Sequence, residues 1–530
     1  MADPPIHNLP VEVLTQIFQL TAHCSGKNCS NLVTLVVDTL CDGVWHEVTV
    51  HTTPTLDISH TCSHWRAIAI STPSLWSRLD IELYLRVENE VTLDLVNLYL
   101  SRSTPALLTL RLGGYDLGDG VDRKIFEAIA KEKFRWQVAD FTELMCSDWV
   151  DWDFPENGDC ENLKVLGLPR ISTRDDVNLF FQRIGKTPEL HRLSINGSWY
   201  SKSILGSLPE LLPFQQVTSF DIVDENSRPR VKWCHYHKIL SHLPNLQKLS
   251  IKSHFRVFTR ISDRDVRLEC LALPHLQKLV FYVHDRPDLP VSAACFFQSF
   301  KAPPLSVLQL DTMKNTMPIT TSVQSNFLDS LHTFLGVSEC QLRELKLTGD
   351  VLDTHMILSL LKATPAVEQL SIHGGHKRLE LFEALTIHGQ PGSEVDSGAS
   401  QSQEWGQSIP LPRLTKLDMT VILDFEELEK RDSVEDEADV EDTVDVVLDR
   451  ISAMVSSRRH TIPSSHSLQS VAALQRFRFC VQRAVPCTES MTKWLSHFYS
   501  FTVPRLRALA GGGFELELLT ETKYINIDEM

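Results

Sequence analysis

Residues 246–251 read Leu-Gln-Lys-Leu-Ser-Ile, with apolar side chains at the first, fourth and sixth positions. The last three residues alternate apolar and polar, which is typical of a strand that buries one face. The same spacing recurs along the chain, and from Trp136 to Val217 its copies follow one another every 27 residues. Such a period indicates stacked structural repeats. The copies begin at Trp76, Leu107, Trp136, Leu163, Leu190, Val217, Leu246, Leu276, Leu305, Leu342, Val367, Leu414, Leu474 and Leu506.

The segments between these copies carry helical periodicity and end near prolines, as at Thr104-Pro105 and Leu243-Pro244. The residue before a proline is steered away from helical backbone, so each helix is expected to stop there. A strand followed by a helix that leads back to another strand predicts an α/β fold with parallel strands. The expected helices are 91–103, 121–134, 173–186, 235–243, 323–336, 353–363 and 440–455.

These units resemble the leucine-rich repeat family in a degenerate form, and segment 246–251 carries the match most clearly. The asparagine that the family places beyond the last apolar position is missing. Because one unit cannot bury its strand alone, the resemblance implies a strand–helix solenoid, here without a regular asparagine ladder. The residues that stand in place of the asparagine include Ile171, Ser198, Glu225 and His254.

The N-terminal residues 9–20 are predicted to form a short amphipathic helix. Pro10 suits the first helical position, where its missing N–H is not needed, and Glu12 in the first turn suits the helix dipole. A helix this short is marginal alone and must bury its apolar stripe. The stripe consists of Val13, Leu14, Ile17 and Phe18.

Two further clusters, residues 58–69 and 74–79, follow this helix and contain a Cys…Trp-Arg helix and a final Leu-Trp. With Leu-Pro and Ile-Phe in the first helix, they resemble the F-box family over residues 5–81. An insert at residues 21–57, with the strand-like run 43–50, replaces the short link usual in the family. An ordinary helical subdomain packed on the rest of the chain is the alternative.

The F-box resemblance implies binding to a Skp-type adaptor and, through it, to a cullin. Helix-in-groove association is the expected physical mode, since a partner would complete the apolar stripe. The predicted adaptor contacts are Leu9, Pro10, Val13, Leu14, Ile17, Phe18, Trp65 and Trp76.

Composition sets the remaining boundaries. The repeat array is expected over 82–388, and residues 424–449 form an acidic segment with thirteen acids and two bases. This segment is interpreted as a solvated loop, with an acidic docking tail as the alternative. The other parts are a flexible loop at 389–410, a further repeat strand at 411–423, and C-terminal repeats with a cap at 450–530, including a last strand at 514–520.

Several functional classes are disfavoured. The net charge of −17 argues against nucleic acid binding. The sequence contains no run of about 18 apolar residues, so no membrane-spanning helix is expected. Twelve cysteines in 530 residues are too sparse for a disulfide scaffold, so a cytoplasmic or nuclear protein is expected.

No motif predicts a catalytic site, a cofactor or a metal. His46 and His51 are one residue too far apart for a zincin helix, and Cys24 and Cys29 lack a paired Cys-x-x-Cys knuckle. A hydrolase with scattered catalytic residues stays open, as does a non-degradative scaffold. The favoured interpretation is a non-catalytic subunit of a ubiquitin ligase, whose repeat array holds an unidentified target protein.

The third residue of a copy, such as Lys248 before Leu249, is often basic. These residues would form a row across neighbouring strands, which Glu344 interrupts. A basic row would suit an acidic or phosphorylated target segment, and ordinary solvated strand residues are the alternative. The residues of this predicted row are Arg192, Lys248, Lys278, Lys416 and Arg476.

Overall fold

The computed structural model divides the chain into two compact units. The first comprises Met1–Leu246 with Ser250–Ser253, and the second comprises Gln247–Leu249 with His254–Met530. Apart from Ile6 and Leu352, the described residues are 9–23, 32–41, 44–84, 90–115, 121–145, 158–169, 173–196, 214–224, 233–253, 269–284, 296–313, 321–348, 354–374, 379–386, 411–423, 450–458, 473–483 and 515–521.

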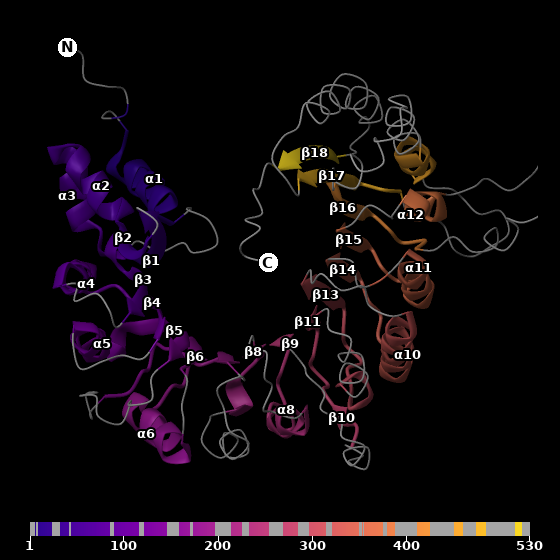
Figure 1. Cartoon of the computed structure of the whole chain (residues 1–530), viewed down its shortest axis with the longest axis horizontal. Coiled ribbons are helices and arrows are strands. Elements are labelled where there is room, and N and C mark those ends of the chain that lie inside the picture. Colours follow the sequence, from indigo (N-terminus) through magenta and orange to yellow (C-terminus); the bar gives the residue numbers. More distant parts are fainter. Residues whose placement is uncertain are drawn as a thin grey trace, which may run out of the picture. The chain divides into compact units, whose positions relative to one another are not determined.

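The first unit opens with a small helical bundle formed by α1 (Val11–His23), α2 (Pro54–Thr61), α3 (Ser63–Ser71) and the 3₁₀ turn η2 (Pro73–Trp76). Helix α1 contacts the other three elements (Figure 1). The bundle therefore buries part of the short first helix within this chain, as its length requires.

The sheet of the first unit starts with a hairpin formed by the predicted insert. Strands β1 (Leu32–Cys41) and β2 (Val44–Thr52) are antiparallel, and β1 also pairs in parallel with β3 (Arg78–Tyr84). The strand-like run predicted at 43–50 is confirmed, and the insert extends the sheet. The following strands pair in parallel in chain order: β4 (Leu108–Tyr115), β5 (Trp136–Met145), β6 (Val165–Leu168), β7 (Arg192–Asn196) and β8 (Ser219–Asp224).

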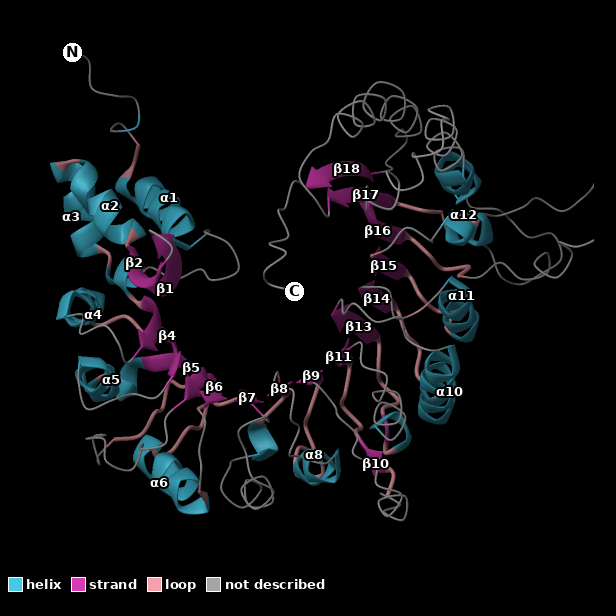
Figure 2. Cartoon of the chain, in the orientation of Figure 1, coloured by secondary structure: helices cyan, strands magenta, loops and turns pink. Residues whose placement is uncertain are grey.

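Helices follow the strands and lie on one side of the sheet in the first unit (Figure 2). The core lies between these two layers, where alternate strand residues such as Leu79 and Ile81 are fully buried. Polar residues between them, such as Asp80, belong to the opposite face. The helical elements are α4 (Glu90–Ser103), α5 (Val121–Lys131), η3 (Lys133–Arg135), α6 (Arg174–Ile184), η6 (Phe214–Gln216) and α8 (Trp233–Leu240).

The second unit has the same strand–helix construction. Its main strands pair in parallel, in the order β11 (Lys278–His284), β13 (Val307–Met313), β14 (Glu344–Thr348), β15 (Gln369–His373), β16 (Lys416–Leu423), β17 (Arg476–Arg483) and β18 (Glu515–Glu521). The helices are α10 (Thr321–Ser338), α11 (Thr354–Ala363), α12 (Leu379–Leu385) and residues 450–458. Strand β9 (Lys248–Ser253) has residues in both units, and β10 (Leu271–Ala272) pairs with β12 (Phe300–Lys301).

The predicted α/β class, with a large parallel sheet, is confirmed. In most repeats the strand starts two residues after the first apolar residue, as Lys248 follows Leu246. The first apolar side chain therefore packs in the turn before the strand. The loop at 389–410, the acidic segment at 424–449 and the copy at Leu506 lie outside the described residues.

Neighbouring repeats of the first unit are joined by side-chain amides in the turns before the strands. Asn162 Nδ2 donates to the carbonyl of Phe134 at 3.0 Å, and Asn245 Nδ2 donates to the carbonyl of Gln215 at 2.6 Å. These bonds satisfy backbone acceptors that a turn leaves without a partner. These two hydrogen bonds connect consecutive turns of the first unit.

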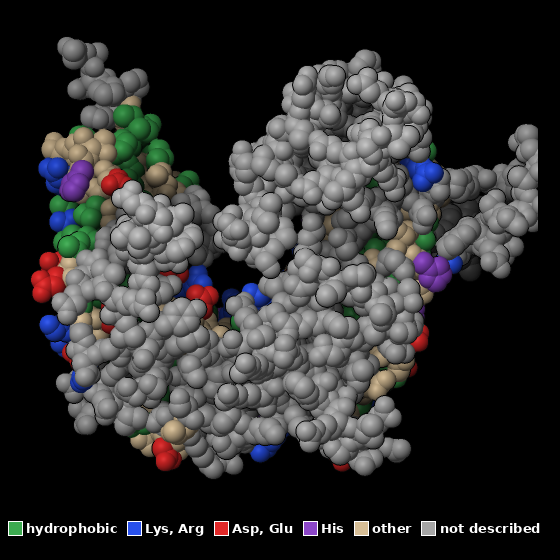
Figure 3. Space-filling view, in the orientation of Figure 1, with side chains coloured by type: hydrophobic (Ala, Val, Ile, Leu, Met, Phe, Trp, Pro, Cys, Tyr) green, Lys and Arg blue, Asp and Glu red, His purple; other side chains and the backbone are tan. Residues whose placement is uncertain are grey.

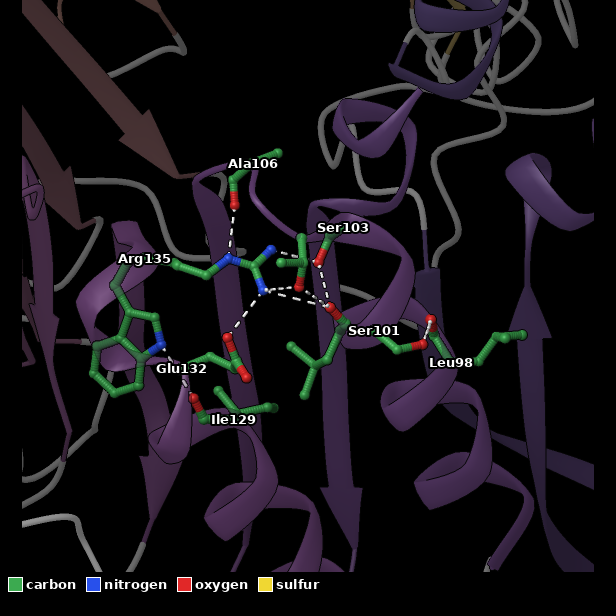
Figure 4. Close-up of polar contacts among 10 residues, drawn as sticks. Leu98, Ser101, Ser103, Ala106, Ile129, Glu132 and Arg135 are labelled. Atoms are coloured by element: carbon green, nitrogen blue, oxygen red, sulfur yellow. Dashed lines mark hydrogen bonds and ion pairs between the residues drawn. The ribbon is translucent and has the colours of Figure 1, made fainter. Parts of the chain in front are cut away.

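Arg135 is a buried cation that joins the end of α4 to the start of β5 (Figure 4). Its Nε donates to the carbonyl of Ala106 at 2.9 Å, and Nη2 donates to Ser103 Oγ at 2.7 Å. Its Nη1 donates to Thr104 Oγ1 at 3.1 Å and forms an ion pair with Glu132 at 2.9 Å. The guanidinium thus satisfies the acceptors left at a helix C-terminus.

Replacing Arg135 should loosen this junction strongly. Arg135→Leu leaves several buried acceptors without a donor, and we expect the free energy of local unfolding to fall by about 2–4 kcal/mol. Hydrogen exchange over residues 100–145 of the full chain measures this directly. The matched control is Arg123→Leu, which removes a partly exposed ion pair with Glu127 and should cost less than about 1 kcal/mol. Equal losses in both variants would contradict the role assigned to Arg135.

Candidate functional site

Helix α1 has one face that belongs to the core of the bundle. Leu14, Phe18 and Ala22 are spaced four residues apart, so they lie on one side of the helix, and all three are buried. The ring of Phe18 packs against that of Trp65 with a centroid separation of 4.8 Å. Gln19 Nε2 also donates to Ser74 Oγ at 3.1 Å, which ties α1 to η2.

Several other positions on α1 and just before it are apolar and exposed, among polar ones such as Glu12 and Gln16. Leu9, just before the helix, is 36% exposed, and Val13 is 39% exposed. Val11 and Leu20 are more exposed still, at 48% and 62%. Figure 3 shows apolar side chains gathered over this helix. Single exposed apolar residues are ordinary, but a group on one short helix is typical of a surface that meets a partner.

The predicted adaptor contacts therefore separate into two groups. Leu9, Pro10 and Val13 are exposed, and Ile17 and Trp65 are half-buried, so these five remain candidates for direct contact.

Leu14, Phe18 and Trp76 are buried in the core of the bundle, so they present almost no surface to a partner, and their contact with an adaptor stays a prediction. Trp76 shows the reason most clearly. Its Nε1 donates to the carbonyl of Ala69 at 2.7 Å, and its ring packs against Tyr99 and beneath the Arg102 guanidinium. All three residues hold the exposed face in place from inside the bundle.

A second candidate surface is the sheet face of the first unit that points away from the helices. Strand register places one residue of each strand in a continuous row across this face. In Figure 3, acidic and basic side chains lie together over its first strands. The row consists of Asp80, Arg111, Asp140, Gly167, Ser194 and Asp221.

Arg111 lies between carboxylates from both neighbouring strands. Its Nη2 is 2.6 Å from Glu143 Oε1, whereas its Nη1 is 3.7 Å from Asp80 Oδ2. Further along the face, Arg192 Nε donates to Asp221 Oδ2 at 2.7 Å. The guanidinium of Arg111 is thus drawn toward Glu143, and Asp80 is left with a long ion pair.

The Asp80 carboxylate is electrostatically unfavourable where it lies. Burial raises its pKa to about 6, Arg111 offsets part of this rise, and the negative charges of Glu143, Glu82 and Asp140 add to it. No hydrogen bond to this carboxylate is present among the described residues. A buried anion in this state favours any change that brings a positive charge or a proton to it.

The predicted basic row is less uniform than the sequence suggested. Arg192 is exposed but pairs with Asp221, in the first unit. In the second unit, Lys278, Lys416 and Arg476 are half-buried at the first positions of their strands, as is Lys248 in β9. Register sets Glu344 and Gln369 between them, so the row in the second unit is mixed.

The sheet face of the second unit also carries polar side chains that contact one another. Lys346 pairs with Glu344 at 2.8 Å, and Gln309 Nε2 donates to Asp311 Oδ2 at 2.7 Å. His373 Nδ1 lies 2.7 Å from Thr420 Oγ1, and burial lowers the pKa of His373. This histidine is therefore neutral near pH 7.

Within the described residues, no group of three or more histidine, cysteine, aspartate or glutamate side chains could hold a metal ion. In the same part of the chain, no helix is both long and apolar enough to cross a membrane. No protein-family model matches this sequence, and a search of curated proteins returns no significant relative.

The sequence pattern did not reveal the three acids of this row, Asp80, Asp140 and Asp221, because only one polar position of each repeat was compared. The acids stand two residues after the position examined, as Asp80 follows Arg78 and Asp221 follows Ser219. A comparison of that later position across the repeats would have found Asp80, Asp140 and Asp221. The pairing of Arg111 with Glu143 needs the strand register, which no single-strand pattern contains.

Neutralising Asp80 should stabilise the first unit at neutral pH. The folded pKa of about 6 lies above the usual 3.8, so the native state binds more protons between these values and loses stability as the pH rises through them. Asp80→Asn removes this penalty, and we expect a gain of about 1–3 kcal/mol at pH 7 that disappears toward pH 4.

Hydrogen exchange of β3 and β4 at the two pH values measures the effect of Asp80→Asn. The control Asp94→Asn, at an exposed position of α4, should change stability by less than about 0.5 kcal/mol at either pH. A loss of stability in Asp80→Asn at pH 7 would contradict the assignment.

Proposed function

We propose that this chain is a non-catalytic substrate adaptor of a Skp–cullin–F-box ubiquitin ligase. In this proposal residues 5–81 are an F-box whose α1 surface docks a Skp-type adaptor, and through it a cullin. The parallel sheet and its helices form a leucine-rich-repeat-like solenoid that holds the target protein. Ubiquitin transfer is carried out by other subunits, in the cytoplasm or nucleus, where such ligases act.

The observation that carries the proposal is the two-sided construction of α1. Leu14 and Phe18 fix the helix in its bundle, while Val13 and Leu20 on the helix, and Leu9 just before it, remain exposed. A helix with an apolar face that its own chain does not cover suits docking into a partner's groove. The motif order that resembles the F-box coincides with this bundle, which supports the same assignment.

Proximity supplies the mechanism of such an adaptor. A target held on the sheet is brought to a high effective concentration near a conjugating enzyme that the cullin recruits. This requires rigidity between the docking helix and the target surface. Strand β3 follows η2 of the bundle directly in the chain, and it pairs with β1 through backbone hydrogen bonds. The bundle is thereby joined to the sheet of the same unit.

The proposal predicts that exposed and buried apolar residues of α1 have different roles. Leu9→Asp combined with Val13→Asp should reduce recovery of the adaptor and the cullin at least about tenfold on affinity purification of the full chain from cells. The fold should survive, because both positions are exposed, and circular dichroism checks this. Leu14→Asp should instead unfold the bundle.

The control for this experiment is Val337→Asp, which places the same charge at an apolar position of α10 that is 57% exposed. It should leave adaptor recovery unchanged. Recovery of no Skp-type adaptor with the unmodified chain would make the proposal wrong. Recovery of the adaptor without a cullin would favour a non-degradative F-box scaffold.

A further inference from the structure

The sheet face of the first unit carries an excess of acid among its described side chains. It presents three guanidinium groups, from Arg78, Arg111 and Arg192, against a larger number of carboxylates. Arg192 is committed to Asp221, and Arg111 is committed mainly to Glu143. The carboxylates are Asp80, Glu82, Asp140, Glu143 and Asp221.

Asp80 is only weakly compensated by the described residues of this face. Its side chain is only 8% exposed, its single ion pair is 3.7 Å long, and no described residue donates a hydrogen bond to it. Most buried carboxylates accept hydrogen bonds, and an ionised one without them is costly. A cationic group arriving from outside would supply the missing donor.

Glycines stand beside several of the carboxylates on this face. Gly113 lies in register between Glu82 and Glu143, and it places no side chain between them. A Cβ added there would lie 3.6 Å from Glu143 Oε2 and 3.9 Å from Glu82 Cγ. Gly167 leaves room beside Asp140, because an added Cβ would clash with Asp140 Oδ1.

We propose that this face of the first unit binds a basic, arginine- or lysine-bearing segment of the target protein. A guanidinium or ammonium group placed over Asp80 donates hydrogen bonds to carboxylates that Arg111 does not satisfy. An arginine is favoured over a lysine, because its planar group reaches two carboxylates at once. The proposal rests on the proposed function, since it names the class of target that the adaptor would hold.

The test measures binding of short labelled peptides to the full chain by fluorescence anisotropy at about 0.15 M salt, where long-range attraction is screened. The probes are a peptide of alternating Arg and Ser and its Glu–Ser counterpart. We expect the Arg–Ser peptide to bind more tightly. Asp80→Asn with Glu143→Gln should raise its dissociation constant at least about tenfold.

A charge-matched control separates this face from the general acidity of the chain. Glu435→Gln with Asp436→Asn removes the same net charge from the acidic segment, and it should change the dissociation constant by less than about threefold. Equal weakening by both double variants would overturn the proposal, because attraction would then follow net charge alone. Preference for the Glu–Ser peptide would also overturn it.

A variant that is expected to tighten peptide binding distinguishes a specific effect from loss of binding through misfolding. Arg111→Gln removes the internal cation that competes for Asp80 and Glu143, so it should tighten binding of the Arg–Ser peptide. Weaker binding in this variant, with the fold intact by circular dichroism, would contradict the proposal. Binding should also weaken as the pH falls below about 6 in the unmodified chain, and less so in Asp80→Asn.

Recovery of the Skp-type adaptor from the same variants keeps the two proposals distinguishable. None of the Asp80, Glu143 or Arg111 substitutions touches the exposed surface of α1, so adaptor recovery should stay unchanged. Loss of peptide binding with normal adaptor recovery supports the basic-segment proposal. Normal adaptor recovery with no difference between peptides overturns it and leaves the proposed function standing.

Discussion

Backbone pairing between successive parallel strands is the interaction on which the rest of each unit depends. A single strand–helix repeat has too little apolar surface to fold alone, so each strand depends on its neighbours in the sheet and on a helix that packs on one face. Register then follows from the first apolar residue of each repeat, which packs in the turn before its strand. Once register is set, the polar residues of the opposite face fall into rows. The row that contains Asp80, Asp140 and Asp221 is therefore a consequence of the same strand pairing that builds the core.

The fold was predictable wherever burial alone determines the pattern. Leu249 and Ile251 predict a strand because they alternate with the polar Ser250 and so share one face, and both are fully buried in β9. The segment 21–57 was harder, because the path of an insert depends on which distant strand accepts it. The strand-like run at 43–50 was recognisable, whereas the pairing of β1 with β3 depends on tertiary contacts.

The candidate site was predictable only in part, for two different reasons. In α1 the apolar stripe is wider than one face, so its sequence could not separate inward Leu14 and Phe18 from outward Leu9 and Val13. The inward face of the helix is set by packing against Trp65, which lies more than forty residues further along the chain. Charges on the sheet were misjudged because a lysine or arginine at one strand position says nothing of a carboxylate brought beside it by the next strand.

The hairpin at the start of the first unit has a mechanical consequence. In general, a docking module attached through a flexible linker samples many orientations. In most of them a bound target would lie far from the enzyme that modifies it. Here β1 pairs with β3 through main-chain hydrogen bonds, and η2 of the bundle contacts both β3 and α4, so the bundle is joined directly to the first strands. Under the proposed function, this continuity would limit which lysines of a bound target a conjugating enzyme can reach.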